Sequence, residues 1–132
     1  MRRATPVFVS ELTRVEVISA IQRKSRDGQL TAVNAASLVA AFEHDLIEAD
    51  GPTDAVFTVL RLGSEVLDEA VSILDRHPLR AADAIQLATA MVARRVLPAL
   101  TTFLSFDRRL AEAAAAEGFA TEPVFPKHHH SP

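Results

Sequence analysis

The sequence predicts an α/β fold in which a mostly parallel sheet is flanked by helices. Short runs rich in β-branched and aromatic residues alternate with longer segments of helical character, a pattern typical of parallel strands joined by helices. Only 5% of the 132 residues are aromatic, all of them Phe, so Ala, Leu and Val must fill the interior. The length and the 48% hydrophobic content suit one core. We therefore expect a single domain over residues 1–125 and a disordered tail over residues 126–132.

The N-terminal half predicts a strand, two helices and a second strand. In chain order these elements span Pro6–Val9, Glu11–Arg26, Ala32–Glu48 and Ala55–Leu60. Ser10 and Thr31 precede the two helices and are suitable N-caps, because their hydroxyls can accept hydrogen bonds from the first-turn amides. Gly28 is a suitable stop for the first helix, and the turn at residues 50–52 ends the second.

The C-terminal half predicts three helices and two strands. The helices span Ser64–Arg76, Leu79–Arg95 and Arg108–Glu117, and the strands span Leu100–Phe106 and Thr121–Phe125. Pro78 and Pro98 interrupt the helical segments, and Gly118 ends the last one. We see no internal repeat and no low-complexity linker, which agrees with a single domain.

Composition excludes several classes of function. The chain has no Cys, so a disulfide framework, a thiolate zinc site, an iron–sulfur cluster and a cysteine nucleophile are ruled out, and the cytoplasm is the expected compartment. No apolar run reaches the roughly 18 residues that a membrane span needs, and no signal-like segment is present, so we expect no membrane association. The net charge of −3 argues against a general nucleic-acid coat protein, although a local basic patch is compatible with it.

Asp83 is a carboxylate in an apolar helix. It is the only charged residue between Ala81 and Ala93, so most of this helix is expected to be buried. A buried carboxylate is costly unless a cation, a metal ion or several hydrogen-bond donors contact it. Asp83 is therefore a candidate metal ligand. In a simpler interpretation it pairs with Arg80 or complements the helix dipole.

Glu16 and Asp107 raise the same question. The helical neighbours of Glu16 at four residues' distance are Leu12 and Ala20, which predicts that its carboxylate projects near the core-facing side; the alternative is an exposed Glu. Asp107 follows a predicted strand, at the sheet edge where α/β proteins bind ligands, although Asp is also an excellent N-cap. Strand alternation places Ser105 on the same side as Asp107.

These three carboxylates can converge at the carboxyl edge of one sheet. Brought close together they would repel one another, so they would need a divalent cation to stay ionised. Ligands that are all oxygen atoms select Mg²⁺ or Mn²⁺ over softer metals. The sequence thus predicts a metal site formed by Glu16, Asp83 and Asp107.

Three segments resemble the PIN-domain family, and in particular its VapC-type toxin ribonucleases. Residues 10–17 (SELTRVEV), 79–90 (LRAADAIQLATA) and 103–110 (FLSFDRRL) are similar to the segments that carry the family's second, third and fourth acidic residues. Their order and separations suit the family, and the similarity covers residues 7–124. The resemblance implies a PIN-like fold of three layers, with helices on both faces of the sheet.

The resemblance also implies a function. The chain would be a metal-dependent endoribonuclease that hydrolyses RNA phosphodiester bonds, the toxin of a type II toxin–antitoxin pair, with Mg²⁺ or Mn²⁺ held by Glu16, Asp83 and Asp107. Thr13 and Ser105 are candidates for orienting water or a ligand. The candidates for contacts to the RNA backbone are Arg14, Arg108 and Arg109, for which ordinary solvated helix charge is the alternative. A VapB-like antitoxin and a second copy of the chain are the implied partners.

One departure from the family bears on activity. The family's first acidic residue ends an N-terminal hydrophobic strand, and this chain has neither that strand nor that Asp before Ser10. The missing strand would be central, between those at residues 7–9 and 100–106. These two strands would then close up, or another chain would fill the gap, or Met1 is not the native start, which is the explanation we favour. The rival function is a catalytically inactive PIN-like module that binds an antitoxin-like partner or RNA without cleavage.

Overall fold

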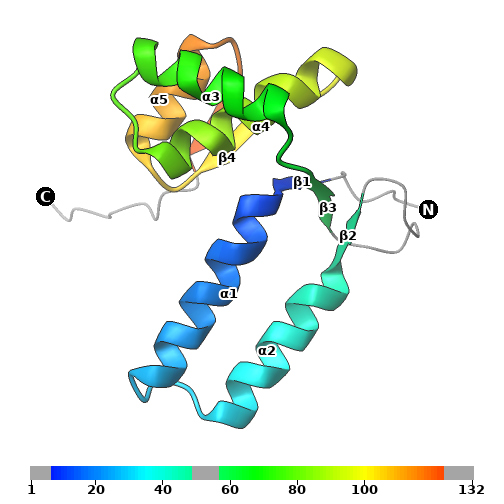
Figure 1. Ribbon diagram of the computed structural model, residues 1–132, viewed down its shortest axis with the longest axis vertical. Coiled ribbons are helices and arrows are strands. Elements are labelled where there is room, and N and C mark those ends of the chain that lie inside the picture. The colour runs from blue at the N-terminus through cyan, green and yellow to red at the C-terminus, as the bar shows by residue number, and fades with distance from the viewer. Residues whose placement is uncertain (1–6, 49–56, 124–132) are drawn as a thin grey trace, which may run out of the picture. The chain divides into compact units, whose positions relative to one another are not determined.

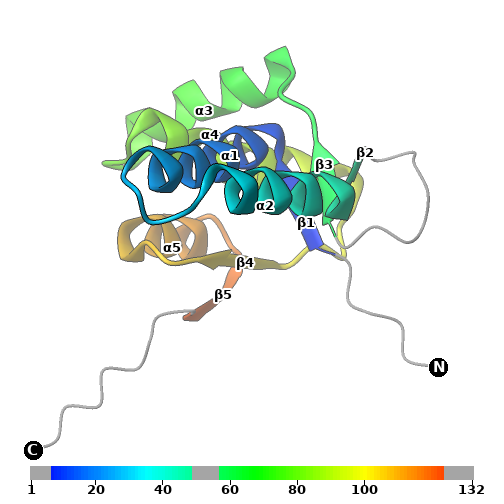
Figure 2. The same ribbon diagram turned by 90° about the horizontal axis from the view of Figure 1, so that it is seen from below.

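A computed structural model describes residues 7–48 and 57–123 and divides the chain into two compact units, Met1–Leu62 and Gly63–Pro132 (Figures 1 and 2). The first unit contains β1 (Val7–Ser10), α1 (Glu11–Arg26), α2 (Ala32–Asp45), β2 (Leu46–Glu48) and β3 (Phe57–Leu60). The second contains α3 (Ser64–Arg76), α4 (Ala81–Val96), β4 (Thr102–Ser105), α5 (Arg108–Ala116) and β5 (Ala120–Pro123).

A three-stranded parallel sheet organises the first unit. Its strand order is β1-β3-β2, and β3 pairs in parallel with both neighbours. Val59, at the centre of β3, is 7% exposed and lies opposite Val9 of β1. The predicted strands at both positions are confirmed over the residues that the structure describes; Pro6, Ala55 and Val56 lie outside them.

Helices α1 and α2 form an antiparallel pair that extends from this sheet (Figure 1). Both predicted N-caps are confirmed: the hydroxyls of Ser10 and Thr31 accept hydrogen bonds from first-turn amides. Gly28 follows α1 with a φ of +78°, a left-handed conformation in which a Cβ would be strained. Ala35, near the start of α2, is 2% exposed and belongs to the buried interior.

The second predicted helix is shorter than expected. It ends at Asp45, and Leu46–Glu48 form strand β2 instead of a last helical turn. Leu46 already has extended backbone angles, and Leu46–Glu48 pair with Phe57–Val59 of β3. Hydrogen bonds to another strand outweigh the weak local preference of three residues for a helix.

The core of the second unit lies between α3, α4 and α5. Helix α3 packs against α4, and α4 contacts α5. The largest fully buried side chains are Ile73 of α3 and Leu87 of α4, and burial of each stabilises the unit by about 1.5–3 kcal/mol. Ala84 and Ala88 of α4 are completely buried as well. The apolar run around Asp83 is therefore a helix with one fully buried face, formed by Ala84, Leu87, Ala88, Thr89 and Met91, while its other residues are half-buried or exposed.

Strands β4 and β5 form a separate parallel pair with α5 between them in sequence. Gly118 after α5 has a φ of +95°, which suits the predicted stop, and the Phe103 and Phe119 rings pack at a centroid distance of 5.9 Å. Strand β4, at Thr102–Ser105, is shorter than the predicted strand over Leu100–Phe106.

The predicted α/β class with parallel strands is confirmed. Among the described strands, β1 pairs with β3 in the sheet of the first unit, and β4 pairs with β5 in the second unit. The turn at residues 50–52, the end of the last predicted strand and the tail over residues 126–132 lie outside the described residues. No helix within the described ranges is long and apolar enough to cross a membrane.

Candidate functional site

The carboxyl end of β1 is tied to the chain that follows β3. The Ser10 hydroxyl, in a residue that is 3% exposed, accepts a hydrogen bond from the Leu12 amide at 3.1 Å. The Glu11 carboxylate accepts one from the Leu62 amide at 2.6 Å. These bonds fix the start of α1 relative to the ends of two strands. The sequence interpretation did not single out Glu11, and its signal is weak, because an acidic residue in a first helical turn is common.

Thr13 and Glu16 lie one turn apart on α1. Thr13 is half-buried, whereas Glu16 is exposed, so the prediction that Glu16 projects toward the core-facing side is wrong. Residues four apart on a helix differ by about 40° around its axis. Leu12 and Ala20 are half-buried, and Glu16 is turned away from them enough to reach solvent.

Arg14 is held by Glu43 of α2. Its Nε donates to both Glu43 carboxylate oxygens at 3.0 Å, and its Nη2 lies 2.9 Å from Oε1. The hydrogen bond to Glu43, reinforced by the charge of that carboxylate, raises the pKa of Arg14. Because the Glu43 carboxylate partly neutralises the field of this guanidinium, Arg14 attracts a phosphate less strongly than an arginine without an acidic partner would.

Asp83 lies in the first turn of α4, at the border of the core. It is half-buried, while Ala84 and Leu87, one and four residues later, are completely buried. The helix is anchored by these apolar neighbours, which fixes the position of the Asp83 backbone. The carboxylate also sits at the helix end where the peptide dipole favours negative charge.

Ser105 and Asp107 form a compact turn between β4 and α5. The Asp107 amide donates to the Ser105 hydroxyl at 2.9 Å, and that hydroxyl donates to the Asp107 carbonyl at 3.2 Å. Asp107 Oδ1 accepts from the Leu110 amide at 3.2 Å, so Asp107 is the N-cap of α5. The capping role is thus confirmed. It uses one carboxylate oxygen, and a carboxylate has lone pairs on two, so a second contact through Oδ2 is compatible with it.

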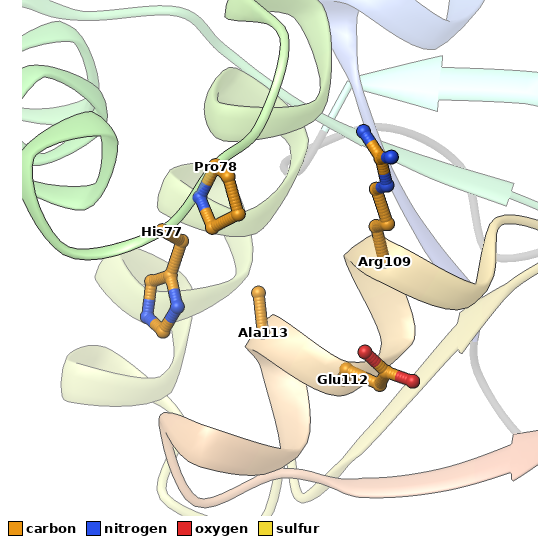
Figure 3. A pocket seen from close by; sticks show the side chains of 5 residues that line it. All are labelled: His77, Pro78, Arg109, Glu112 and Ala113. Atoms are coloured by element: carbon orange, nitrogen blue, oxygen red, sulfur yellow. The ribbon is translucent and has the colours of Figure 1, made fainter.

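Arg108 and Arg109 follow directly on α5, and both are exposed. Arg109 lines a groove of about 400 Å³ together with four other residues: His77, Pro78, Glu112 and Ala113. Figure 3 shows Ala113 on the side of α5 that faces the His77–Pro78 segment, with Arg109 and Glu112 along the same helix. The groove therefore runs between the chain before α4 and the helix after Asp107.

Glu117 bonds to three side chains, those of Arg76, His77 and Arg94, and the sequence pattern did not predict this cluster, the Glu117 hub. Its Oε2 lies 2.7 Å from His77 Nε2 and accepts from Arg76 Nε at 3.1 Å. Arg94 donates to the Glu117 carbonyl at 2.9 Å and lies 4.0 Å above the Phe119 ring. The hydrogen bond with His77, aided by that from Arg76, holds the pKa of the Glu117 carboxyl below its ordinary value.

Glu117→Gln should therefore make the second unit less stable in a pH-dependent way. Because folding lowers the pKa of Glu117, its stabilisation is present above the ordinary carboxyl pKa and is lost as pH falls through the lowered value. We expect a loss of about 1–3 kcal/mol in the free energy of unfolding at pH 7, shrinking below about pH 4. Urea unfolding across pH measures it. Glu112→Gln, an exposed carboxylate on α5, is the control and should change stability by less than about 0.5 kcal/mol.

The three predicted carboxylates are divided between the two units: Glu16 is in the first, and Asp83 and Asp107 are in the second. Within either unit, the described residues contain no group of three His, Cys, Asp or Glu side chains that could hold a metal ion. The donor chemistry nevertheless fits a hard divalent cation, because the candidates offer carboxylate and hydroxyl oxygens only.

Comparison with known proteins gives one clear match. The PIN domain family matches residues 1–116, which includes all three segments whose acidic residues were singled out above. A search of curated proteins finds no match to the chain. The match covers both strand–helix junctions described here and most of the sequence, and on this basis the chain belongs to the PIN domain family.

Proposed function

We propose that this protein is a metal-dependent endoribonuclease of the VapC type. The PIN domain is a nuclease fold, and its members typically depend on divalent metal ions and act on RNA. In the proposal, Glu16, Asp83 and Asp107 hold Mg²⁺ or Mn²⁺. The observation that carries it is the turn at residues 105–107, where Ser105 fixes the backbone of an exposed Asp107 next to two exposed arginines.

The candidate residues of the second unit have roles that their local geometry supports. A bound divalent ion would lower the pKa of a water molecule and neutralise charge on the phosphate oxygens. The Ser105 hydroxyl and the Leu110 amide hold Asp107 in place, so its carboxylate is oriented before substrate binds. Asp83 is positioned by the buried part of α4. Arg108 and Arg109 supply positive charge for the phosphates that flank the cleaved bond.

The proposal extends to partners. The resemblance of residues 10–17, 79–90 and 103–110 to VapC segments supports a role as the toxin of a type II pair, with a VapB-like antitoxin and a homodimer of the toxin. An antitoxin would block cleavage by covering the acidic residues and the arginines beside them.

A nuclease assay tests the proposal. Purified protein is incubated with labelled single-stranded RNA in Mn²⁺ or Mg²⁺, and in EDTA, alongside Asp83→Asn. We expect cleavage that depends on the metal ion and falls at least about 100-fold in the variant, since a lost ligand removes several kcal/mol of transition-state stabilisation. Asp75→Asn, which changes an exposed Asp of α3 in the same unit, is the matched control and should cleave like the wild type.

The same assay addresses the rival function. Cleavage that survives in EDTA, or that Asp83→Asn leaves intact, would contradict the proposed site. Binding of RNA or of an antitoxin-like peptide by folded wild-type protein, without cleavage in either metal ion, would instead establish the inactive binding module.

A further inference from the structure

Phe106 stands in the turn between β4 and α5 with 76% of its surface exposed. It separates Ser105 from Asp107, the two residues whose hydrogen bonds shape that turn. Burial of a Phe side chain contributes about as much favourable free energy as burial of a Leu or an Ile, and an exposed Phe forgoes that contribution. Single exposed apolar side chains are common on protein surfaces. What distinguishes Phe106 is that its exposed side chain is an aromatic ring directly beside a candidate catalytic carboxylate.

The other phenylalanines in the described ranges are placed differently. They are half-buried or buried, and most of them pack against another ring: Phe8, Phe42, Phe57, Phe103 and Phe119. In a chain without Trp or Tyr, Phe106 is thus the exposed aromatic ring of the described residues. The Phe106 ring does not contribute to the core of the second unit.

We propose that Phe106 is a stacking platform for a nucleobase of the RNA substrate, an inference that rests on the proposed function. Unpaired bases in RNA commonly stack on aromatic side chains, while arginines bind the adjoining phosphates. Phe106 is followed within three residues by Asp107, Arg108 and Arg109, so ring, carboxylate and cations lie along one short stretch. Stacking on the ring would place the adjacent phosphodiester near Asp107.

The surroundings favour RNA over a protein partner as the occupant. Apart from Leu104, which is 56% exposed two residues earlier, the sequence neighbours of Phe106 are polar: Ser105, Asp107 and then two exposed arginines, whose positive charge attracts phosphates. Arg109 also lines the edge of the groove between α5 and the His77–Pro78 segment, where it can contact a neighbouring phosphate (Figure 3). Because a paired base cannot stack on a protein ring without leaving its helix, the substrate class is single-stranded RNA or an unpaired loop.

The test measures RNA binding in an Asp83→Asn background, in which cleavage does not interfere. Two labelled probes of about 15 nucleotides are compared by fluorescence anisotropy in Mg²⁺: a single-stranded RNA of mixed sequence and an abasic ribose-phosphate chain of equal charge. Phe106→Ala and Phe106→Leu should bind the RNA about five- to tenfold more weakly and the abasic chain unchanged. Phe106→Trp should keep the wild-type affinity, because it retains a ring.

A matched control and a second readout make the result specific. Leu104 is 56% exposed two residues earlier on β4, so Leu104→Ala removes exposed apolar surface without removing a ring and should bind both probes normally. RNA that carries 5-iodouridine should photo-crosslink to Phe106, as mapped by mass spectrometry.

Two outcomes would overturn the stacking role. If Phe106→Leu binds RNA as tightly as the wild type, an apolar contact suffices and no base stacks there. If Phe106→Ala weakens binding of the abasic chain as much as binding of the RNA, Phe106 contacts the sugar–phosphate backbone and not a base. Either result can accompany normal Mn²⁺-dependent cleavage, in which case the nuclease proposal stands. Ring-dependent RNA binding in a protein that never cleaves would instead sustain the stacking role and refute the nuclease.

Discussion

Replacing Asp107 by Asn should abolish cleavage without unfolding the protein. Asn is as good an N-cap as Asp, so its side chain can still accept the hydrogen bond from the Leu110 amide. It has no negative charge, however, and is a poor ligand for Mg²⁺ or Mn²⁺. We expect the cleavage rate to fall at least about 100-fold, and the free energy of unfolding to change by less than about 0.5 kcal/mol.

A second variant separates the two roles of Asp107. Asp107→Ala removes both the cap and the charge, so it should lose activity equally and also lose about 0.5–2 kcal/mol of stability. Single-turnover RNA cleavage and urea unfolding measure the two effects on the same preparations. If Asp107→Asn keeps more than about a tenth of the wild-type rate, Asp107 is only a helix cap, and the proposed ligand set is wrong.

Much of the secondary structure could be predicted because its signals are local. Ser10, Thr31 and Asp107 cap helices through hydrogen bonds to residues two or three positions away. Gly28 and Gly118 end helices with positive φ angles that a single residue type favours. The family followed from three short segments in register, and the match over residues 1–116 confirms it.

What the sequence could not show depends on residues far apart in the chain. β2 forms because Leu46–Glu48 find a partner in β3, against a local pattern that continues the helix. The Glu117 hub joins residues 40 and 41 positions apart, and no periodicity links them. The orientation of Glu16 was predicted wrongly for a different reason. Residues four apart on a helix differ by about 40° around its axis, so half-buried neighbours at that spacing do not fix which way the residue between them points.

Leu87→Ala should be the most destabilising single substitution in the second unit. Leu87 is 0% exposed and lies in α4, the helix that packs against α3 and contacts α5. Truncation loses the transfer free energy of the side chain and leaves a cavity between helices, which together cost about 2–5 kcal/mol. Urea unfolding followed by circular dichroism measures the loss. Leu97→Ala, at the end of the same helix with Leu97 42% exposed, is the control and should cost less than about 1 kcal/mol.

The same substitution connects the core to the candidate site. Leu87 lies one turn after Asp83, so the packing of Leu87 fixes the helix from which Asp83 projects. Leu87→Met conserves volume and should cost less than about 1.5 kcal/mol, with cleavage retained. Leu87→Ala should then lower cleavage in proportion to the fraction of unfolded protein, and the activity should return when temperature is reduced. Equal stability of Leu87→Ala and Leu97→Ala would show that α4 is not anchored at Leu87, and the position assigned to Asp83 would lose its physical basis.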